Sequence, residues 1–402
     1  MSHKRFCGFL GLAVFLSLTV QAFGSALDIQ SLKLGKVTLK SAGKMTFGPD
    51  GILFVGDWMD GKVVALDTGD RTPVKSAPML DVKGIDQKVA ALLGTTADRL
   101  LIEDVIVNPI SKNIYMSVSL GRGPDAVPVI LRMSSTGKLT EVSLDNVHHS
   151  VNVLPNPIGI NLPIRVEEDV AASAASKKSR QSLYVKVNTM PAYEKGRTFR
   201  VYAITDMKYA DGKLYVAGLS TEEFSSSFRV IPFPFPDRVD EETGVLMYHS
   251  GHGRFETNSP IRSFTITSVA NQPTIFAGYT CSPLVKIPMS QMKPGGAVKG
   301  VTVTELGGGS TPLDMITYRK ASRNYILVAS TRSEFNAVQR LPLDGMDEAL
   351  ELTSIYPDNG GVPFEVVPGL EGVVQMDHYD ANHLMLVSSV NGSLDLTTVP
   401  TP

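Results

Sequence analysis

Residues 204–218 read ITDMKYADGKLYVAG and combine a short strand, a tight turn at Asp211 and Gly212, and a second strand of alternating large apolar residues. An Asp-Gly turn between two such runs is a strong local signal for a β-hairpin. Five other stretches have the same form, separated by spacings of 51–63 residues and one spacing of 102. Counting this one, the six hairpins start at or near Met45, Asp104, Asp206, Ser263, Asp314 and Asp377.

Further strand-like segments follow the hairpins. Third strands are expected at residues 61–67, 127–132, 228–231, 284–287 and 337–341, and fourth strands at 138–144, 244–249 and 301–306. Three or four short strands per unit, repeated about six times, predict an all-β fold of the β-propeller type. The physical reason is that a four-stranded sheet buries its two faces only against neighbouring sheets. We favour six blades; seven is the alternative, with a degenerate blade in the long spacing.

Three segments depart from the repeat. The last unit ends after its third strand at 393–399, so we expect the N-terminal strand within residues 29–39 to close the last blade and cover its edge. Residues 86–94, DQKVAALLG, predict one short helical insertion. Residues 152–197 contain AASAASKKSRQS and predict an irregular insertion. Residues 27–402 are therefore expected to form a single β-propeller domain.

The N-terminus predicts export. Lys4 and Arg5 precede an apolar run at residues 6–20, and small residues follow at 24–26, which is the layout of a secretory signal peptide over residues 1–26. An uncleaved anchor is the alternative. After cleavage we expect a periplasmic or secreted monomer with no membrane span. Cys7 would leave with the signal, so Cys281 would have no partner for an internal disulfide.

Composition narrows the classes of partner. The chain has 38 Lys and Arg and 40 Asp and Glu, a formal net charge of −2, and no basic stripe with interleaved aromatic residues. Nucleic acid is therefore excluded as an expected partner. The sequence also has no GxSxG, HExxH, P-loop or EF-hand motif. A protein partner or a small molecule is the expected ligand.

Residues 47–67, FGPDGILFVGDWMDGKVVALD, resemble the blade motif D-x-x-G-x-L-Y-V-x-D…N-x-V-x-x-F-D of the NHL, YVTN and SMP-30-type β-propellers. The segments LGRGPDA, AGLSTEEF and YTCSPLVK resemble those of a family of bacterial exported propellers, which implies no activity. SMP-30-like members are six-bladed, metal-dependent lactonases and esterases that hold their metal with a Glu at the start of an inner strand. Here Lys44 and Met45 stand at that point, so the resemblance implies the fold and not the chemistry.

Inner strands of a propeller line a central channel, and we expect four aspartates in the same register near its mouth. Loops around the mouth should add Trp58 and several charged or reactive residues. The candidate ligand-binding residues are Asp104, Asp206, Asp314, Asp377, Trp58, Arg122, Glu222, Cys281 and Arg332.

Four converging carboxylates would repel one another at low dielectric. Three interpretations remove that repulsion. A hard cation such as calcium is bound, with Asp206, Asp314 and Asp377 as ligands; some carboxylates take up protons; or each accepts backbone N–H groups of a neighbouring blade.

Two other features could carry chemistry. His249 and His252, in YHSGHGRFE, could place two imidazoles on one metal ion, although the sequence shows no third ligand beside them. The alternative is a loop histidine bonded to backbone carbonyls. Cys281 is either a nucleophile or a small buried apolar residue.

These patterns support three hypotheses about function. The first is an exported binding or scaffold protein that uses the loop-rich channel face for a partner protein or small ligand. The second is a metal-dependent, calcium-type lactonase or esterase that uses the inner-strand aspartates. The third is a quinoprotein-like oxidoreductase or its accessory protein.

Overall fold

A computed structural model describes residues 31–402 except 75, 124, 160–198, 238–240, 281, 333–334 and 353–359. The predicted signal peptide, Cys281 and most of the predicted insertion at 152–197 lie outside the described residues. In the described part of the chain, no helix has the length and apolar character that crossing a bilayer requires.

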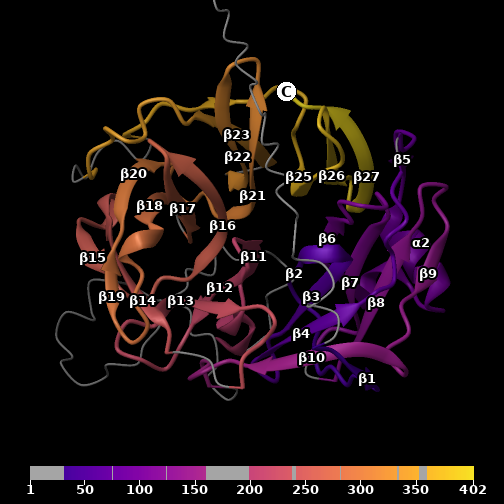
Figure 1. Cartoon of the computed structure of the whole chain (residues 1–402). Helices are drawn as coiled ribbons and strands as arrows, with labels where there is room; N and C mark the ends of the chain where they lie inside the picture. Colours follow the sequence, from indigo (N-terminus) through magenta and orange to yellow (C-terminus); the bar gives the residue numbers. More distant parts are fainter. Residues whose placement is uncertain are drawn as a thin grey trace, which may run out of the picture.

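Six sheets stand around a common axis and form a six-bladed β-propeller, as predicted (Figure 1). From the axis outward, blade 1 contains β2 (Met45–Phe47), β3 (Ile52–Asp57), β4 (Lys62–Asp67), β10 (Val147–Val153) and β1 (Lys33–Gly35). Blade 2 contains β6 (Leu100–Val107), β7 (Ile114–Leu120), β8 (Val127–Met133) and β9 (Leu139–Glu141). Blade 3 contains β11 (Asp206–Ala210), β12 (Lys213–Leu219), β13 (Ser226–Pro232) and β14 (Thr243–His249), extended by β15 (Arg254–Glu256) and β19 (Ala297–Lys299).

The other three blades have four strands each. Blade 4 contains β16 (Ile261–Val269), β17 (Gln272–Tyr279), β18 (Pro283–Pro288) and β20 (Val301–Glu305). Blade 5 contains β21 (Pro312–Lys320), β22 (Arg323–Arg332), β23 (Phe335–Pro342) and β24 (Glu365–Val366). Blade 6 contains β25 (Val373–His378), β26 (His383–Val390), β27 (Ser393–Pro400) and β5 (Asp81–Val82). The turn that first indicated the fold has φ of 48° at Asp211 and 75° at Gly212, as a two-residue hairpin turn requires.

The blades are not arranged in chain order. Blade 2 lies between blades 6 and 1, so the order around the ring is 2, 1, 3, 4, 5, 6 (Figure 1). Each neighbouring pair encloses its own apolar cluster. Phe54 and Val216 belong to the cluster between blades 1 and 3, and Met116 and Met385 belong to the cluster between blades 2 and 6.

The predicted closure by the N-terminal strand is wrong. That strand, β1, pairs with β10 at the outer edge of blade 1, and the last blade is completed by β5, which pairs with β27. The segment between β4 and β6 supplies β5, so the chain reaches the outer edge of blade 6 before it enters blade 2. Blade 1 is also composite, since β10 returns to it after blade 2. Blade 1 and blade 6 thus each contain a strand from another part of the chain, β10 and β5 respectively. Each of these strands covers a sheet edge that would otherwise be exposed.

The predicted helical insertion is confirmed as α2 (Ile85–Leu92), beside the β5–β27 closure. Ile85 and Val89 are buried in the cluster between blades 2 and 6. Asp86 accepts hydrogen bonds from the Ser393 hydroxyl and the Leu394 N–H. The helix thus packs between two blades and fixes the start of β27. Short 3₁₀ turns occupy Pro49–Gly51, Ala97–Arg99, Phe199–Ala203, Ser250–His252 and Met289–Gln291.

The β5 closure predicts a stability effect at Thr398. The Leu80 N–H donates to Thr398 Oγ1 at 2.6 Å, in a buried position. Thr398→Val should lower the free energy of unfolding by about 1–2 kcal/mol, because it leaves that buried N–H unpaired. Thr397→Val is the matched control and should change it by less than about 0.5 kcal/mol. Equal effects of the two substitutions in urea titrations would contradict this closure.

Candidate functional site

The inner strands place an aspartate in every second blade around the channel. Asp104, Asp206 and Asp314 occupy the same position on β6, β11 and β21. In the intervening blades that position holds Lys44, Ser263 and Gln375.

Asp377 lies two residues further along β25 than Gln375, so the prediction that all four aspartates share one register is wrong for Asp377. Residues two apart on a strand face the same side, which is why the sequence did not distinguish the two levels.

Each of these carboxylates accepts a backbone N–H from the inner strand of the next blade. The four bonds are all 2.8 Å long and run in one sense around the ring. They join Asp104 to Met45, Asp206 to Phe264, Asp314 to Met376 and Asp377 to Val107. The interpretation of the aspartates as ties between blades is confirmed. Ser263 adds a hydroxyl bond to Asp206 at 2.9 Å.

Two lysines that the sequence analysis missed lie among these carboxylates. Lys44 Nζ is 2.9 Å from Asp104 Oδ1, and Lys208 Nζ is 3.6 Å from Asp206 Oδ1. Burial lowers the pKa of Lys44, but attraction by Asp104, Asp314 and Asp206 outweighs it and raises that pKa well above its ordinary value. The protein therefore supplies cations of its own at the place where calcium was considered. The sequence could have indicated Lys208, because it stands two residues after Asp206 on the same strand and so faces the same channel.

Asp314, like Asp377, is a channel carboxyl whose pKa is raised by burial. Burial raises its pKa to about 6; Lys208 and Lys44 oppose the rise, and repulsion from Asp206 and Asp104 adds to it. Both of its oxygens accept backbone N–H groups, from Met315 and Met376. The interpretation that some carboxylates take up protons thus applies to Asp314.

The channel mouth is narrow. Four inner strands carry a β-bulge just before the channel position, and the bulged residues are Glu103, Arg262, Leu313 and Val374. Bulges redirect side chains, and three of these residues line the hollow at the mouth. Trp58, predicted for this place, lines it too and is 7% exposed. The hollow measures about 50 Å³, far below the several hundred Å³ of a typical small-molecule site.

Arg122 and Glu222, two of the other candidate residues, do not lie at the channel mouth. Arg122 donates to the carbonyls of Asp98 and Leu100 and so supports its own blade. Arg332 ends β22 opposite Phe335, and its side chain is outside the described part of the structure, as is Cys281. Glu222 lies in a separate pocket.

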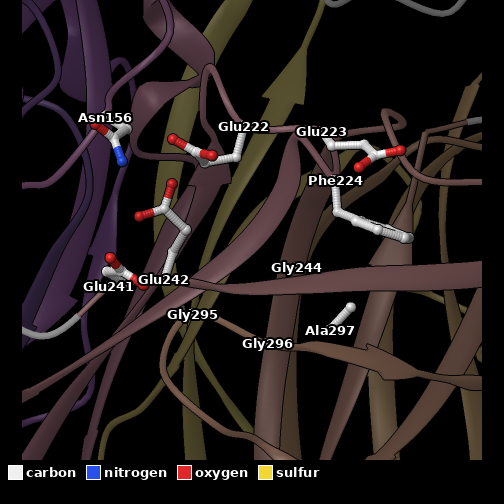
Figure 2. A pocket seen from close by; sticks show the side chains of 10 residues that line it. All are labelled: Asn156, Glu222, Glu223, Phe224, Glu241, Glu242, Gly244, Gly295, Gly296 and Ala297. Carbon is white, nitrogen blue, oxygen red and sulfur yellow. The ribbon is translucent and has the colours of Figure 1, made fainter.

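That pocket is acidic and belongs to blade 3 (Figure 2). It measures about 360 Å³ and lies between the loop after β12, the start of β14 and the turn before β19. The residues that line it are Asn156, Glu222, Glu223, Phe224, Glu241, Glu242, Gly244, Gly295, Gly296 and Ala297. Four of these ten described residues are glutamates and none is basic.

Glu242 is the unusual member of this set. Its side chain is 4% exposed, and neither carboxylate oxygen has a hydrogen-bond partner in the described part of the chain. Arg229, which is fully buried, attracts Glu242 electrostatically, but its guanidinium donates to the carbonyls of Ala203, Leu219 and Pro155. Figure 2 shows the carboxylates of Glu242 and Glu222 turned toward the same region as the Asn156 amide. The sequence analysis did not identify Glu242, because most of the residues that line the pocket with it are distant from it in the sequence.

Comparisons with known proteins show no family. No protein-family model matches the chain, and no curated protein sequence matches it. Among solved structures, the chain is similar to a PQQ-bound aldose sugar dehydrogenase from Streptomyces coelicolor, at 12% identity and a TM-score of 0.31, covering 92% of this chain and 96% of that one. An apo aldose sugar dehydrogenase from Escherichia coli gives 10% identity, a TM-score of 0.33, and coverage of 92% and 99%.

A Bacteroides ovatus GH43B protein from a xyloglucan utilisation locus gives 13% identity and a TM-score of 0.36, covering 75% of this chain and 52% of that one. At these values the similarities carry no argument about a substrate or a cofactor.

The aspartate ties predict a large effect at Asp206. Asp206→Ala removes the acceptor of the Phe264 N–H and leaves Lys208 without its nearest carboxylate. The free energy of unfolding at pH 7 should fall by about 3–5 kcal/mol, as when one partner of a buried pair is removed. The exposed Asp125→Ala is the control and should change it by less than about 0.5 kcal/mol. A loss below about 1 kcal/mol at Asp206, measured by urea unfolding, would show that the tie is not needed.

Asp314 predicts a pH dependence of stability. A carboxyl with a raised pKa in the folded chain contributes stability that is present below the unfolded value of 3.8 and is lost as pH rises through about 6. The free energy of unfolding of the wild type, relative to Asp314→Asn, should therefore fall by about 2.5 kcal/mol between pH 4 and pH 7. A constant difference across that range would exclude the raised pKa.

Proposed function

We propose that this protein is an exported β-propeller that binds an organic cation in the acidic pocket of blade 3. The observation that carries the proposal is the buried Glu242 carboxylate, which faces the pocket without a hydrogen-bond partner in the described chain. A buried carboxylate without hydrogen bonds is costly, and the cost falls when a positively charged group pairs with it. A ligand with such a group would therefore gain binding energy at Glu242.

The other lining residues favour a cationic ligand over a neutral one. Glu222, Glu223 and Glu241 add three carboxylates, so the potential in the pocket is negative and attracts a cation from solution. Arg229 attracts Glu242 and so offsets part of this charge. The side-chain carbonyl of Asn156, which also lines the pocket, can accept a hydrogen bond from an N–H group of the ligand.

The size of the pocket favours an organic cation over a bare ion. A volume of about 360 Å³ lies within the range of small-molecule sites. The half-buried Phe224 also lines it, and an aromatic ring attracts an ammonium or guanidinium group at its face. An amine or guanidine compound of small-metabolite size satisfies both features.

The two enzymatic alternatives find less support. A calcium-dependent hydrolase would hold its ion among the channel aspartates, where Lys44 and Lys208 already lie. A quinoprotein-like oxidoreductase would need a cofactor cavity in the channel, and the hollow beside Trp58 and Lys44 at the mouth, with a volume of about 50 Å³, is too small for one. The acidic pocket therefore remains the better-supported site.

Binding of simple cations to the mature protein tests the proposal. Spermidine, arginine and agmatine should bind with one site per chain in calorimetry, more weakly as salt is added. Glu242→Gln, which keeps the shape of the side chain, should weaken binding at least about tenfold, because a charge-assisted hydrogen bond contributes about 1.5–3 kcal/mol. Glu222→Gln should weaken it less, because Glu222 is exposed.

Glu348→Gln, an exposed glutamate elsewhere on the protein, is the matched control and should leave binding unchanged. Binding that is equally affected by Glu348→Gln and Glu242→Gln would reflect overall charge and not the pocket. Failure of all three cations to bind the wild type would reject the proposal.

A further inference from the structure

A hairpin in blade 3 gathers two histidines and a glutamate. His249 of β14 pairs with Arg254 of β15, and Glu256 follows two residues later on the same face of the hairpin. The turn Ser250–His252 ends at Gly253, whose φ is 63°, and it folds His252 back so that the two imidazole centroids are 3.8 Å apart. One ligand atom from each of His249, His252 and Glu256 lies within 4.8 Å of the other two.

These separations suit a small divalent metal ion. Zinc bonds to nitrogen and oxygen of about 2.0–2.2 Å in a tetrahedral site place neighbouring donor atoms about 3.4 Å apart. His249 Nδ1 and Glu256 Oε2 are 3.3 Å apart. His252 Nδ1 and Glu256 Oε1 are 2.6 Å apart, a hydrogen bond that an ion would replace as it displaces a proton.

The surroundings hold the three side chains in place. Ser259 Oγ donates to Glu256 Oε2 at 2.7 Å, which orients the carboxylate as outer-shell groups do at metal sites. The buried Glu305 accepts from both the N–H and the hydroxyl of Ser250, so the residue after His249 is fixed.

The site has one side open to solvent. The side chains of His249 and Glu256 are 1% and 6% exposed, and that of His252 is 28% exposed. Arg254 lies beside Glu256, with Nε 3.4 Å from Oε1, but its side chain is 53% exposed and can move toward solvent. Three protein ligands leave the fourth position of a tetrahedral site for water.

We propose that His249, His252 and Glu256 form a zinc-type metal site with three protein ligands and one open position. Two imidazoles and one carboxylate are a ligand set that zinc prefers, and they differ from the all-oxygen sets of calcium and magnesium. The site is independent of the acidic pocket and of the proposed cation binding. It assigns to the His-x-x-His motif the third ligand that the sequence alone did not reveal.

Metal titration of the mature chain tests this site. After treatment with a chelator, the wild type should bind one zinc ion per chain in calorimetry and melt at a higher temperature with zinc, and calcium should not substitute. Cobalt(II) should give the visible absorption of a tetrahedral site. His252→Ala and Glu256→Gln should each weaken zinc binding at least about 100-fold, since changes in outer-shell groups alone cost up to that factor.

Two control substitutions show whether zinc binds at this cluster or elsewhere on the protein. His148→Ala removes an exposed histidine of another blade and should leave zinc binding unchanged. Glu242→Gln should also leave it unchanged, which distinguishes the metal site from the acidic pocket. Substitution of His249 is avoided because its side chain is buried. Absence of zinc binding by the wild type, or unaltered binding by both His252→Ala and Glu256→Gln, would overturn the proposal.

Discussion

Carboxylate-to-amide hydrogen bonds join four of the six neighbouring pairs of blades and are the polar interaction at the axis on which this ring depends. Neighbouring inner strands belong to separate sheets, so main-chain ladders do not join them. Asp104, Asp206, Asp314 and Asp377 each carry an acceptor across to the next blade. The buried charges would repel one another, and Lys44 and Lys208 reduce that repulsion. The polar side chains along the axis of the molecule therefore serve to hold the blades together.

Because the channel residues stabilise the fold, the candidate functional sites lie away from the axis. The residues that were predicted to line one opening lie in different places and have different structural roles. Trp58 lines the narrow mouth, Arg122 supports its own blade, and Glu222 lines the pocket of blade 3. Among the described residues, the two features on which the proposals rest are both in blade 3. One is the buried Glu242 at the start of β14, and the other is the cluster around His249 at its end.

The sequence predicted what is local and missed what depends on arrangement. The turn at Asp211 and Gly212, the alternating strands and the helix at Ile85–Leu92 are determined by neighbouring residues. The closure of blade 6 was not predictable, because β5 has two residues and gives almost no pattern. Gln375 and Asp377 face the same side, so their levels depend on a bulge in β25. Glu256 joins His249 only through the register of β14 with β15, which no spacing reveals.

Native-state hydrogen exchange of the four amides at Met45, Val107, Phe264 and Met376 tests the central claim most directly. The account predicts that these amides exchange as slowly as the hydrogen-bonded amides of the inner hairpins. It further predicts that Asp206→Ala, which removes the acceptor of the Phe264 N–H, accelerates exchange at Phe264 far more than at the other three. Rapid exchange at all four positions in the wild type, or no selective change at Phe264, would contradict it and return the aspartates to the candidates for ligand binding.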